Sequence, residues 1–87
     1  MGRYSLFLKE SAAAELERIP KKDLQRIIRR VEALGDGPRP RDCEKLSSRE
    51  LYRVRQGDYR IVYSIDDGGR TVEIFKIGHR NEVYRDR

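Results

Sequence analysis

Residues 51–63, LYRVRQGDYRIVY, predict a tight β-hairpin around which the rest of the chain can be arranged. Two runs of alternating apolar and polar residues flank Gly57-Asp58, and a two-residue loop with glycine in first place suits a type II′ turn. Such a turn sets the register of the two strands. We therefore expect five directly opposed pairs, namely Gln56 with Tyr59, Arg55 with Arg60, Val54 with Ile61, Arg53 with Val62 and Tyr52 with Tyr63.

This register divides the hairpin into an apolar face and a basic face, because opposed residues share a face and successive residues alternate. The core-facing set would be Tyr52, Val54, Tyr59, Ile61 and Tyr63. The basic set would be Arg53, Arg55 and Arg60, grouped around Val62. Like charges directly opposite each other destabilise a strand pair, so Arg55 opposite Arg60 indicates a phosphate site. The alternative is a solvated face whose arginine stems merely cover apolar surface.

Length and composition predict one small domain, residues 1–87, in the cytoplasm. The single cysteine, Cys43, cannot form an intramolecular disulfide, which suits a reducing compartment. One cysteine and one histidine do not make a metal cluster, and we expect neither a metal nor a cofactor. The N-terminal apolar run is too short for a signal peptide, and nothing approaches the length of a membrane span.

The charge balance favours nucleic acid or an acidic protein as a partner. Lysine and arginine total 20 against 15 acidic residues, a net charge of +5. After position 50 the only lysine is Lys76, and the other basic residues are arginines. Arginine presents a rigid fork of donors that matches phosphate, so this bias is typical of a surface that handles RNA.

The N-terminal half predicts a strand followed by two helices. Residues 3–9 alternate as a strand does, and Ser11 is a natural N-cap for a helix over residues 12–18. Pro20 would end this helix, and a second one would cover residues 22–34. The second helix has the clearest amphipathic pattern of the chain, formed by Leu24, Ile27, Ile28, Val31 and Leu34.

The remaining segments predict loops and one more strand. Residues 35–40 would end the second helix in a Gly/Pro loop, and residues 41–50 are polar with Leu46 as a buried anchor. Residues 66–69 predict a second turn. Residues 71–77 are apolar out of strict alternation, which indicates a central strand or a β-bulge. The expected order is β-α-α-β-β-β.

That order, with three local phrases, resembles the RelE/ParE superfamily of toxin–antitoxin toxins, and within it the RelE branch. The phrases are EKL at residues 44–46, YRVRQGDYRIVY at residues 52–63, and IGHR at residues 77–80 followed by Val83-Tyr84. The likeness covers essentially the whole chain. It implies an α+β fold in which an N-terminal helical hairpin packs on a twisted, mainly antiparallel sheet.

The resemblance also implies a function. Members of this branch are microbial mRNA interferases, which cut translated mRNA in the ribosomal A site and are silenced by a cognate RelB-like antitoxin. In such toxins the ribose 2′-OH attacks the adjacent phosphate without a metal. Family catalytic positions map onto Arg53, Arg55, Arg60, Arg80 and Tyr84. The expected RNA-binding set is Arg53, Arg55 and Lys45.

Elementary chemistry agrees with these roles. The transition state of phosphate attack spreads extra negative charge over its oxygens, and preorganised cations stabilise it. Arg55 and Arg60 would form a cationic floor, and Arg80 could add a wall or protonate the leaving 5′-oxygen. Tyr84 could stack on a base, the usual way in which proteins hold single-stranded RNA.

The general base is left open by the sequence. Related toxins often carry lysine where Arg53 or Arg55 stand, and arginine cannot be deprotonated at physiological pH. His79 has the only suitable unperturbed pKa, although a histidine beside a turn commonly bonds locally and points away. Glu44 is a weaker candidate. The third option is slow chemistry by charge stabilisation and orientation, assisted by ribosomal RNA.

Two other functions are compatible with the same fold. One is a ParE-like toxin that poisons DNA gyrase and is not a nuclease. The other is a degenerate member that only binds its antitoxin or RNA. The arginine-rich hairpin face, with Arg80 and Tyr84, favours the RelE branch over both.

Overall fold

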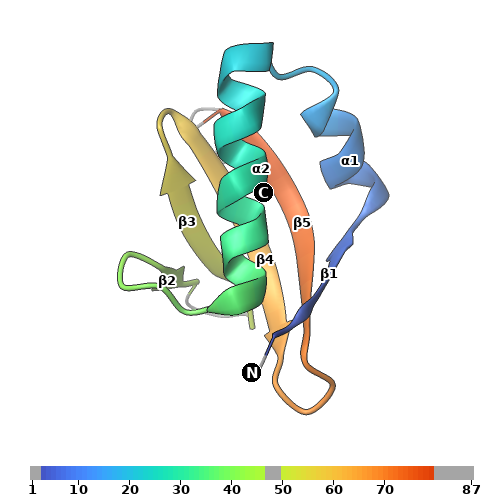
Figure 1. The fold of residues 1–87 in the computed structure, drawn as a ribbon, viewed down its shortest axis with the longest axis vertical. Helices are drawn as coiled ribbons and strands as arrows, with labels where there is room; N and C mark the ends of the chain where they lie inside the picture. The colour runs from blue at the N-terminus through green and yellow to red at the C-terminus, as the bar shows by residue number, and fades with distance from the viewer. Residues whose placement is uncertain (1–2, 47–49, 80–87) are drawn as a thin grey trace.

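The computed structural model describes residues 3–46 and 50–79, which form a five-stranded sheet and two helices (Figure 1). In chain order the elements are β1 (Ser5–Leu8), α1 (Glu10–Leu16), α2 (Lys21–Asp36), β2 (Glu44–Lys45), β3 (Tyr52–Gln56), β4 (Tyr59–Asp66) and β5 (Thr71–His79). The strands lie side by side in the order β1-β5-β4-β3-β2. Only β1 and β5 are parallel, and the other neighbours are antiparallel. The expected α+β architecture is confirmed.

The hairpin of β3 and β4 has the predicted register. Its five pairs are those expected from the turn, including Arg55 opposite Arg60 and Val54 opposite Ile61. Gly57 has a φ of 61°, whereas Asp58 is not among the residues with positive φ. A positive φ at the first loop position alone is the requirement of a type II′ turn.

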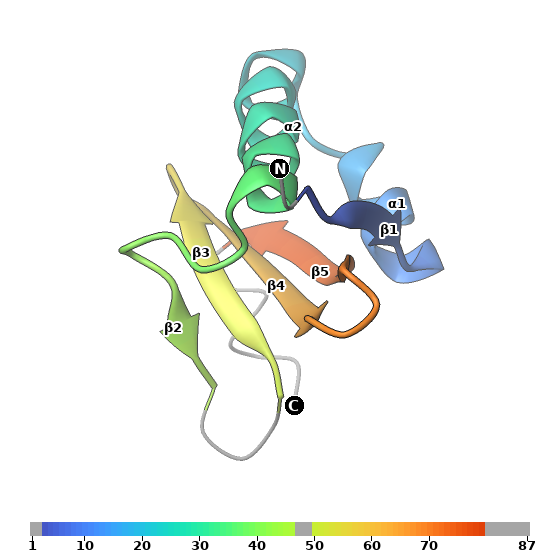
Figure 2. The ribbon, with the colours of Figure 1, turned by 60° about the horizontal axis from the view of Figure 1, so that its bottom comes forward.

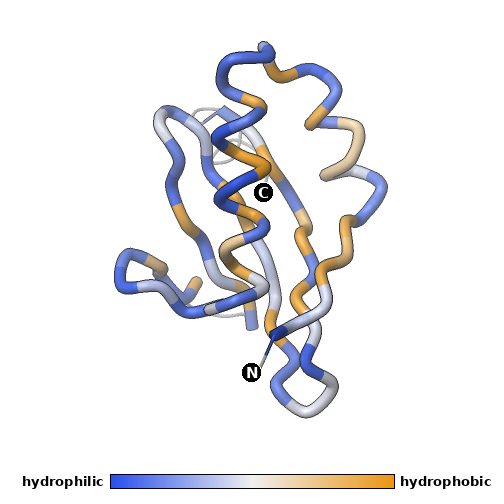
Figure 3. The backbone as a smooth tube through the Cα atoms, viewed as in Figure 1, coloured by the Kyte–Doolittle hydropathy of each residue, from blue (hydrophilic) through white to orange (hydrophobic). Residues whose placement is uncertain are grey.

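The hydrophobic core lies between the helices and one face of the sheet. Figure 2 shows α2 over that face and α1 beside β1. Along α2, polar and apolar residues alternate with the helical period, as the colours of Figure 3 show. The core-facing hairpin residues Val54, Ile61 and Tyr63 are essentially fully buried, together with Ile27 and Leu34 of α2. Each such side chain contributes about 1.5–3 kcal/mol of hydrophobic stabilisation.

Helix α1 begins one residue before the predicted N-cap, so the predicted role of Ser11 is wrong. The helix starts at Glu10, and the Ser11 hydroxyl donates to the Phe75 carbonyl at 3.0 Å. The Ile77 N–H donates to the Glu15 carboxylate at 2.7 Å. Strand β1 pairs with β5 only as far as Ile74, so side chains of α1 bond to β5 beyond that point. These long-range hydrogen bonds outweigh the local preference of serine for a cap.

Helix α2 extends past its predicted end at Leu34 and stops at Asp36. Gly35 therefore lies inside the helix, where a Cβ atom would come within 3.1 Å of the Tyr4 carbonyl oxygen. The Gly35 carbonyl accepts the Tyr4 N–H at 2.7 Å. Glycine here allows β1 to approach the helix closely and does not mark the helix end.

Strand β2 was not predicted, because two polar residues carry no periodic signal. It pairs with β3 through Glu44–Arg53 and Lys45–Tyr52. Leu46, expected as a buried anchor, is only half-buried. The predicted irregularity of the last strand is confirmed: β5 lies between β1 and β4, and the pairing skips Phe75, with Val62 opposite Lys76 and Tyr63 opposite Ile74.

No helix within residues 3–46 and 50–79 is long and apolar enough to cross a membrane.

Candidate functional site

A pocket of about 460 Å³ opens between the first hairpin strand and the segment that leads into β2. Four arginines and two acids are among its lining residues, which are Arg41, Asp42, Cys43, Glu44, Arg53, Val54, Arg55 and Arg60. We call this the arginine pocket. It gathers all three arginines that the hairpin register predicted to share a face, and it adds Arg41, which the sequence did not single out.

The arginines differ in how they are held. Arg60, in β4, is buried with 6% of its surface exposed, whereas Arg55 directly opposite it is exposed. Arg53, one pair further along the basic face, keeps 20% of its side chain exposed. The pocket therefore has a buried cation at its base and more exposed cations toward its rim. A buried cation such as Arg60 needs little reorganisation when an anion binds.

Glu44 supplies an internal anion to this basic group. Its carboxylate forms an ion pair with the Arg53 guanidinium, across the β2–β3 pair that places the two residues opposite each other. The hydrogen bond and charge of Arg53, with smaller effects from Arg55 and Arg60, hold the pKa of Glu44 below its ordinary value. Glu44 thus stays ionised and offsets part of the repulsion expected between Arg55 and Arg60.

Asp42, the second acid of the pocket, forms an ion pair with Arg30 of α2. This contact joins the pocket to the helix. The sequence pattern gave no sign of either pair, because β2 and the loop before it have no periodicity.

The arrangement lines one pocket with four arginines, which can bind an oxyanion. Arginine donates paired hydrogen bonds that match the geometry of phosphate oxygens. Charge stabilisation by preorganised cations is also the largest single contribution expected at a reacting phosphate. Within the described ranges, no group of three or more His, Cys, Asp or Glu side chains could hold a metal ion.

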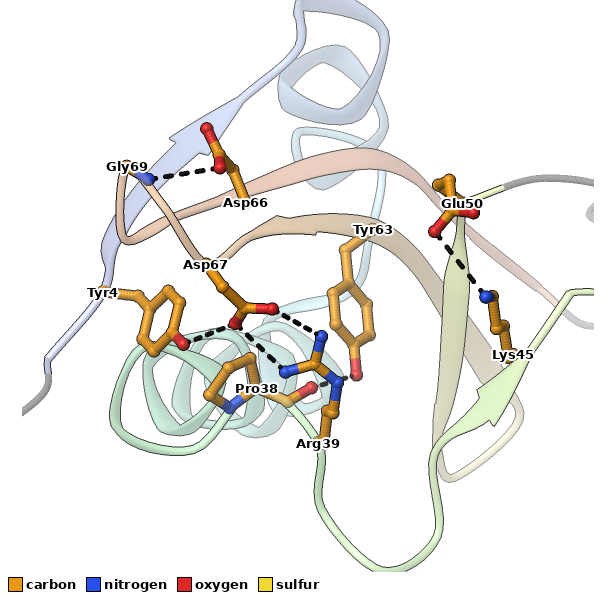
Figure 4. Close-up of polar contacts among 9 residues, drawn as sticks. All are labelled: Tyr4, Pro38, Arg39, Lys45, Glu50, Tyr63, Asp66, Asp67 and Gly69. Carbon is orange, nitrogen blue, oxygen red and sulfur yellow. Dashed lines mark hydrogen bonds and ion pairs between the residues drawn. The ribbon is translucent and has the colours of Figure 1, made fainter.

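Lys45, expected to bind RNA, does not line the arginine pocket. It is paired with Tyr52, whereas Glu44 is paired with Arg53, so Lys45 lies on the opposite side of the strand from the arginines. Its ammonium group is 3.6 Å from the Glu50 carboxylate (Figure 4). The structure therefore separates Lys45 from the other predicted RNA-binding residues.

His79 is also separated from the arginines by the alternation of the sheet. It pairs with Tyr59, a core-face residue, while Arg60 pairs with Gly78. The rings of His79 and Tyr59 meet edge to face with centroids 5.8 Å apart. His79 lines a different pocket of about 270 Å³, with Glu15 and Arg18 of the α1 region. The other two predicted site residues, Arg80 and Tyr84, lie outside the described residues.

A second polar cluster anchors the segment that leads into the arginine pocket (Figure 4). Arg39 donates to both oxygens of Asp67 at 3.1 and 2.9 Å, and the Tyr4 hydroxyl donates to the same carboxylate at 2.7 Å. These bonds lower the pKa of Asp67 to about 2, with the Arg39 bond as the main cause. The guanidinium of Arg39 also lies 5.4 Å from the centre of the Tyr52 ring.

A buried hydrogen bond from the sheet also holds the segment between α2 and β2. The Tyr63 hydroxyl donates to the Pro38 carbonyl at 2.7 Å, and burial raises the pKa of Tyr63. Two of the three tyrosines of the predicted core face, Tyr52 and Tyr63, stack with centroids 5.8 Å apart. The polypeptide between α2 and β2 is therefore fixed by both helix-side and sheet-side contacts, and it positions Arg41 and Asp42 beside the hairpin.

Comparison with known proteins agrees with this architecture. A family model, the ParE toxin of the type II toxin–antitoxin system parDE, matches residues 6–84. The RelE toxin of Mycobacterium tuberculosis is 34% identical over 94% of this chain and 87% of its own length. The RelG toxin of the same organism is 34% identical over 94% of this chain and 97% of its own length.

A solved structure gives the same relationship. The archaeal RelE-RelB complex from Pyrococcus horikoshii contains a chain that superposes with a TM-score of 0.81 and 30% identity, covering 90% of this chain and 96% of that one. The family expected from the hairpin and its flanking phrases is confirmed. The chain belongs to the RelE/ParE superfamily and is a RelE-like toxin of a type II toxin–antitoxin system.

Proposed function

We propose that this toxin is an endoribonuclease that cleaves translated mRNA on the ribosome and so inhibits translation. The observation that carries the proposal is the arginine pocket, in which Arg53, Arg55 and Arg60 converge from two neighbouring strands. A single-stranded RNA backbone supplies the phosphate that such a pocket fits. The net charge of +5 favours association with the ribosome, which is itself rich in phosphate.

The proposed reaction is attack of a ribose 2′-OH on the adjacent phosphorus. The O2′–P bond forms, the P–O5′ bond breaks, and the products are a cyclic phosphate and a free 5′-OH. Arg60 at the buried base of the pocket and Arg55 opposite it stabilise the charge that gathers on the phosphate oxygens. In this proposal Arg80 contributes a further cation or protonates the leaving 5′-oxygen, and Tyr84 stacks on a base.

The proton of the 2′-OH needs a separate acceptor. His79 lies on the other side of the sheet from Arg60, and the lowered pKa of Glu44 makes that carboxylate a weak base. We therefore favour charge stabilisation and substrate orientation in the isolated toxin, with ribosomal RNA assisting proton removal. Such a toxin would be nearly inactive on free mRNA and would depend on the ribosome for its rate.

We further propose that a RelB-like antitoxin silences the toxin. The support is the structural likeness to the toxin chain of the RelE-RelB complex from Pyrococcus horikoshii. A small, partly disordered protein encoded beside the toxin would fold on binding and cover the basic surface. Co-expression should restore growth, and the two proteins should purify together.

The decisive experiment compares two targets. Purified toxin is incubated with programmed ribosomes, and the mRNA is mapped by primer extension. In parallel, the toxin is incubated with DNA gyrase and plasmid. Gyrase is the second target because the matching family model is that of the ParE toxin, and the ParE branch poisons gyrase. Ribosome-dependent cuts with unaffected supercoiling support the proposal. Inhibited supercoiling without mRNA cleavage would assign the chain to the gyrase-poisoning branch. If the toxin neither cleaves mRNA nor inhibits supercoiling, it is a member that only binds its antitoxin or RNA.

A further inference from the structure

The ion pair between Glu44 and Arg53 places a carboxylate beside one guanidinium group of the arginine pocket. The two residues are directly opposed in the β2–β3 pair, and both line the arginine pocket. Arg55 and Arg60 line the same pocket as Glu44, and their charges contribute to the lowered pKa of its carboxylate. Carboxylate and phosphate offer arginine the same pair of acceptor oxygens.

We infer that Glu44 competes with the substrate for the anion-binding site of the arginine pocket, and that a substrate phosphate must displace the Glu44 carboxylate from Arg53. This inference rests on the proposed function for the identity of the substrate, an RNA phosphate. The competition itself requires only that the pocket binds an oxyanion. It makes Glu44 a residue that sets affinity and selectivity, because a weakly held anion is excluded while a doubly engaged phosphate is admitted.

The local structure allows such a displacement. The Glu44 side chain is 59% exposed, whereas that of Arg53 is only 20% exposed, so the acid is the more easily released partner. Glu44 belongs to a two-residue strand at the end of the strand order. Rotation of the exposed Glu44 side chain would free the Arg53 guanidinium without disturbing the hairpin core. An ion pair whose acid is this exposed adds little to stability, so a phosphate held by several arginines can displace the carboxylate.

The test measures oxyanion binding to the full chain by isothermal titration calorimetry, first with inorganic phosphate and then with a short RNA that carries 2′-deoxyribose and cannot be cleaved. Glu44→Gln keeps the size and hydrogen-bonding shape of the side chain but removes its charge. We expect phosphate to bind about threefold more tightly or better, the factor that corresponds to an exposed ion pair.

Glu50→Gln is the matched control, because Glu50 pairs with Lys45 and does not line the pocket. It makes the same change in net charge and should leave phosphate affinity nearly unchanged. In an Arg53→Gln background, Glu44→Gln should no longer raise phosphate affinity, because the guanidinium for which carboxylate and phosphate compete is absent. Equal gains from Glu44→Gln and Glu50→Gln, no gain from Glu44→Gln, or no phosphate binding by either protein would overturn the inference.

Cleavage on programmed ribosomes separates competition from chemistry. If Glu44 competes with RNA, Glu44→Gln should lower the KM for mRNA on programmed ribosomes. A large loss of kcat with retained RNA binding would make Glu44 a group that acts in the reaction, and the inference would fail. Tighter phosphate binding by Glu44→Gln without any cleavage by the wild type would uphold the competition and refute the proposed nuclease function.

Discussion

Arg39 and Arg53 each pair with a carboxylate, but their surroundings differ. The two terminal nitrogens of Arg39 donate hydrogen bonds to the Asp67 carboxylate, which also accepts a hydrogen bond from the Tyr4 hydroxyl. Arg53 has Glu44, in a pocket that also contains Arg41, Arg55 and Arg60. Around Arg39 the charge of one arginine is matched by the charge of one carboxylate. In the arginine pocket the cations outnumber the two acids among the residues that line it.

Under the proposed function, the difference separates a structural arginine from a functional one. A matched pair holds two segments together and has little to offer a ligand. A group of cations that shares few anions stays attractive to an oxyanion, although it costs stability in its absence. We expect substitutions around Arg39 to change stability more than activity, and substitutions in the arginine pocket to do the reverse.

The largest expected effect is on Arg60. Arg60→Ala removes the buried cation of the pocket and should lower ribosome-dependent cleavage by about 10²–10³-fold, the usual cost of losing a preorganised charge donor. Arg26→Ala removes an exposed arginine of α2 and serves as the control of equal charge, with cleavage expected near the wild-type rate. Single-turnover cleavage of mRNA on programmed ribosomes measures both. Wild-type cleavage by Arg60→Ala would move the site away from this pocket.

A second prediction addresses the anchored segment. Tyr63→Phe removes the hydroxyl that donates to the Pro38 carbonyl and leaves a buried acceptor without that bond. The free energy of unfolding should fall by about 1–3 kcal/mol. Urea denaturation followed by circular dichroism gives the value, and cleavage measured well below the denaturation midpoint should change little. A loss of activity larger than the loss of stability would show that the segment also shapes the site.

The pH dependence of stability should reveal the Asp67 cluster. The pKa of Asp67 in the folded protein is about 2, below the ordinary value of an aspartate in an unfolded chain. Because its pKa is lowered on folding, ionised Asp67 stabilises the fold at pH values above its pKa in the unfolded chain. This contribution is lost as the pH falls from about 4 toward 2. The wild type should therefore lose more stability than Asp67→Asn across this interval. Identical pH profiles of the two proteins in urea denaturation would contradict the assignment.

The smallest expected effect on stability concerns the opposed pair Arg55 and Arg60. Arg55→Thr removes a like-charge contact and introduces a β-branched residue on the strand, so the free energy of unfolding should stay equal or rise by a few tenths of a kcal/mol. Cleavage should nevertheless decrease, because a cation of the pocket is lost. Thermal denaturation and single-turnover cleavage of the same preparation check both. A clear fall in melting temperature would mark Arg55 as structural.

Local chemistry explains why the hairpin could be predicted in detail. A two-residue turn with Gly57 in first place admits one register, and the two-residue period of a strand then assigns every side chain to a face. The grouping of Arg53, Arg55 and Arg60 follows from that register. The position of His79 relative to them does not, because it depends on how β5 aligns with β4 after a bulge at Phe75.

Long-range contacts account for the features that the sequence did not indicate. Ser11 forms no cap because the edge of β5 offers its hydroxyl a partner more than sixty residues away. Strand β2 exists because it can pair with β3, and its two residues have no pattern of their own. The same pairing brings Glu44 onto Arg53 and turns Lys45 to the other side, so it decides the electrostatics of the pocket.

By itself, the sequence determined the face that carries the arginines, because turn geometry and periodicity act over neighbouring residues, and its resemblance to the RelE branch implied the fold class and the toxin family. The tertiary structure alone decided which charges meet: Glu44 with Arg53, Asp42 with Arg30, and Asp67 with Arg39. Each of these pairs joins segments whose separation in sequence carries no periodic signal. Electrostatic partners depend on distance in space, and only the packed sheet and helices fix that distance.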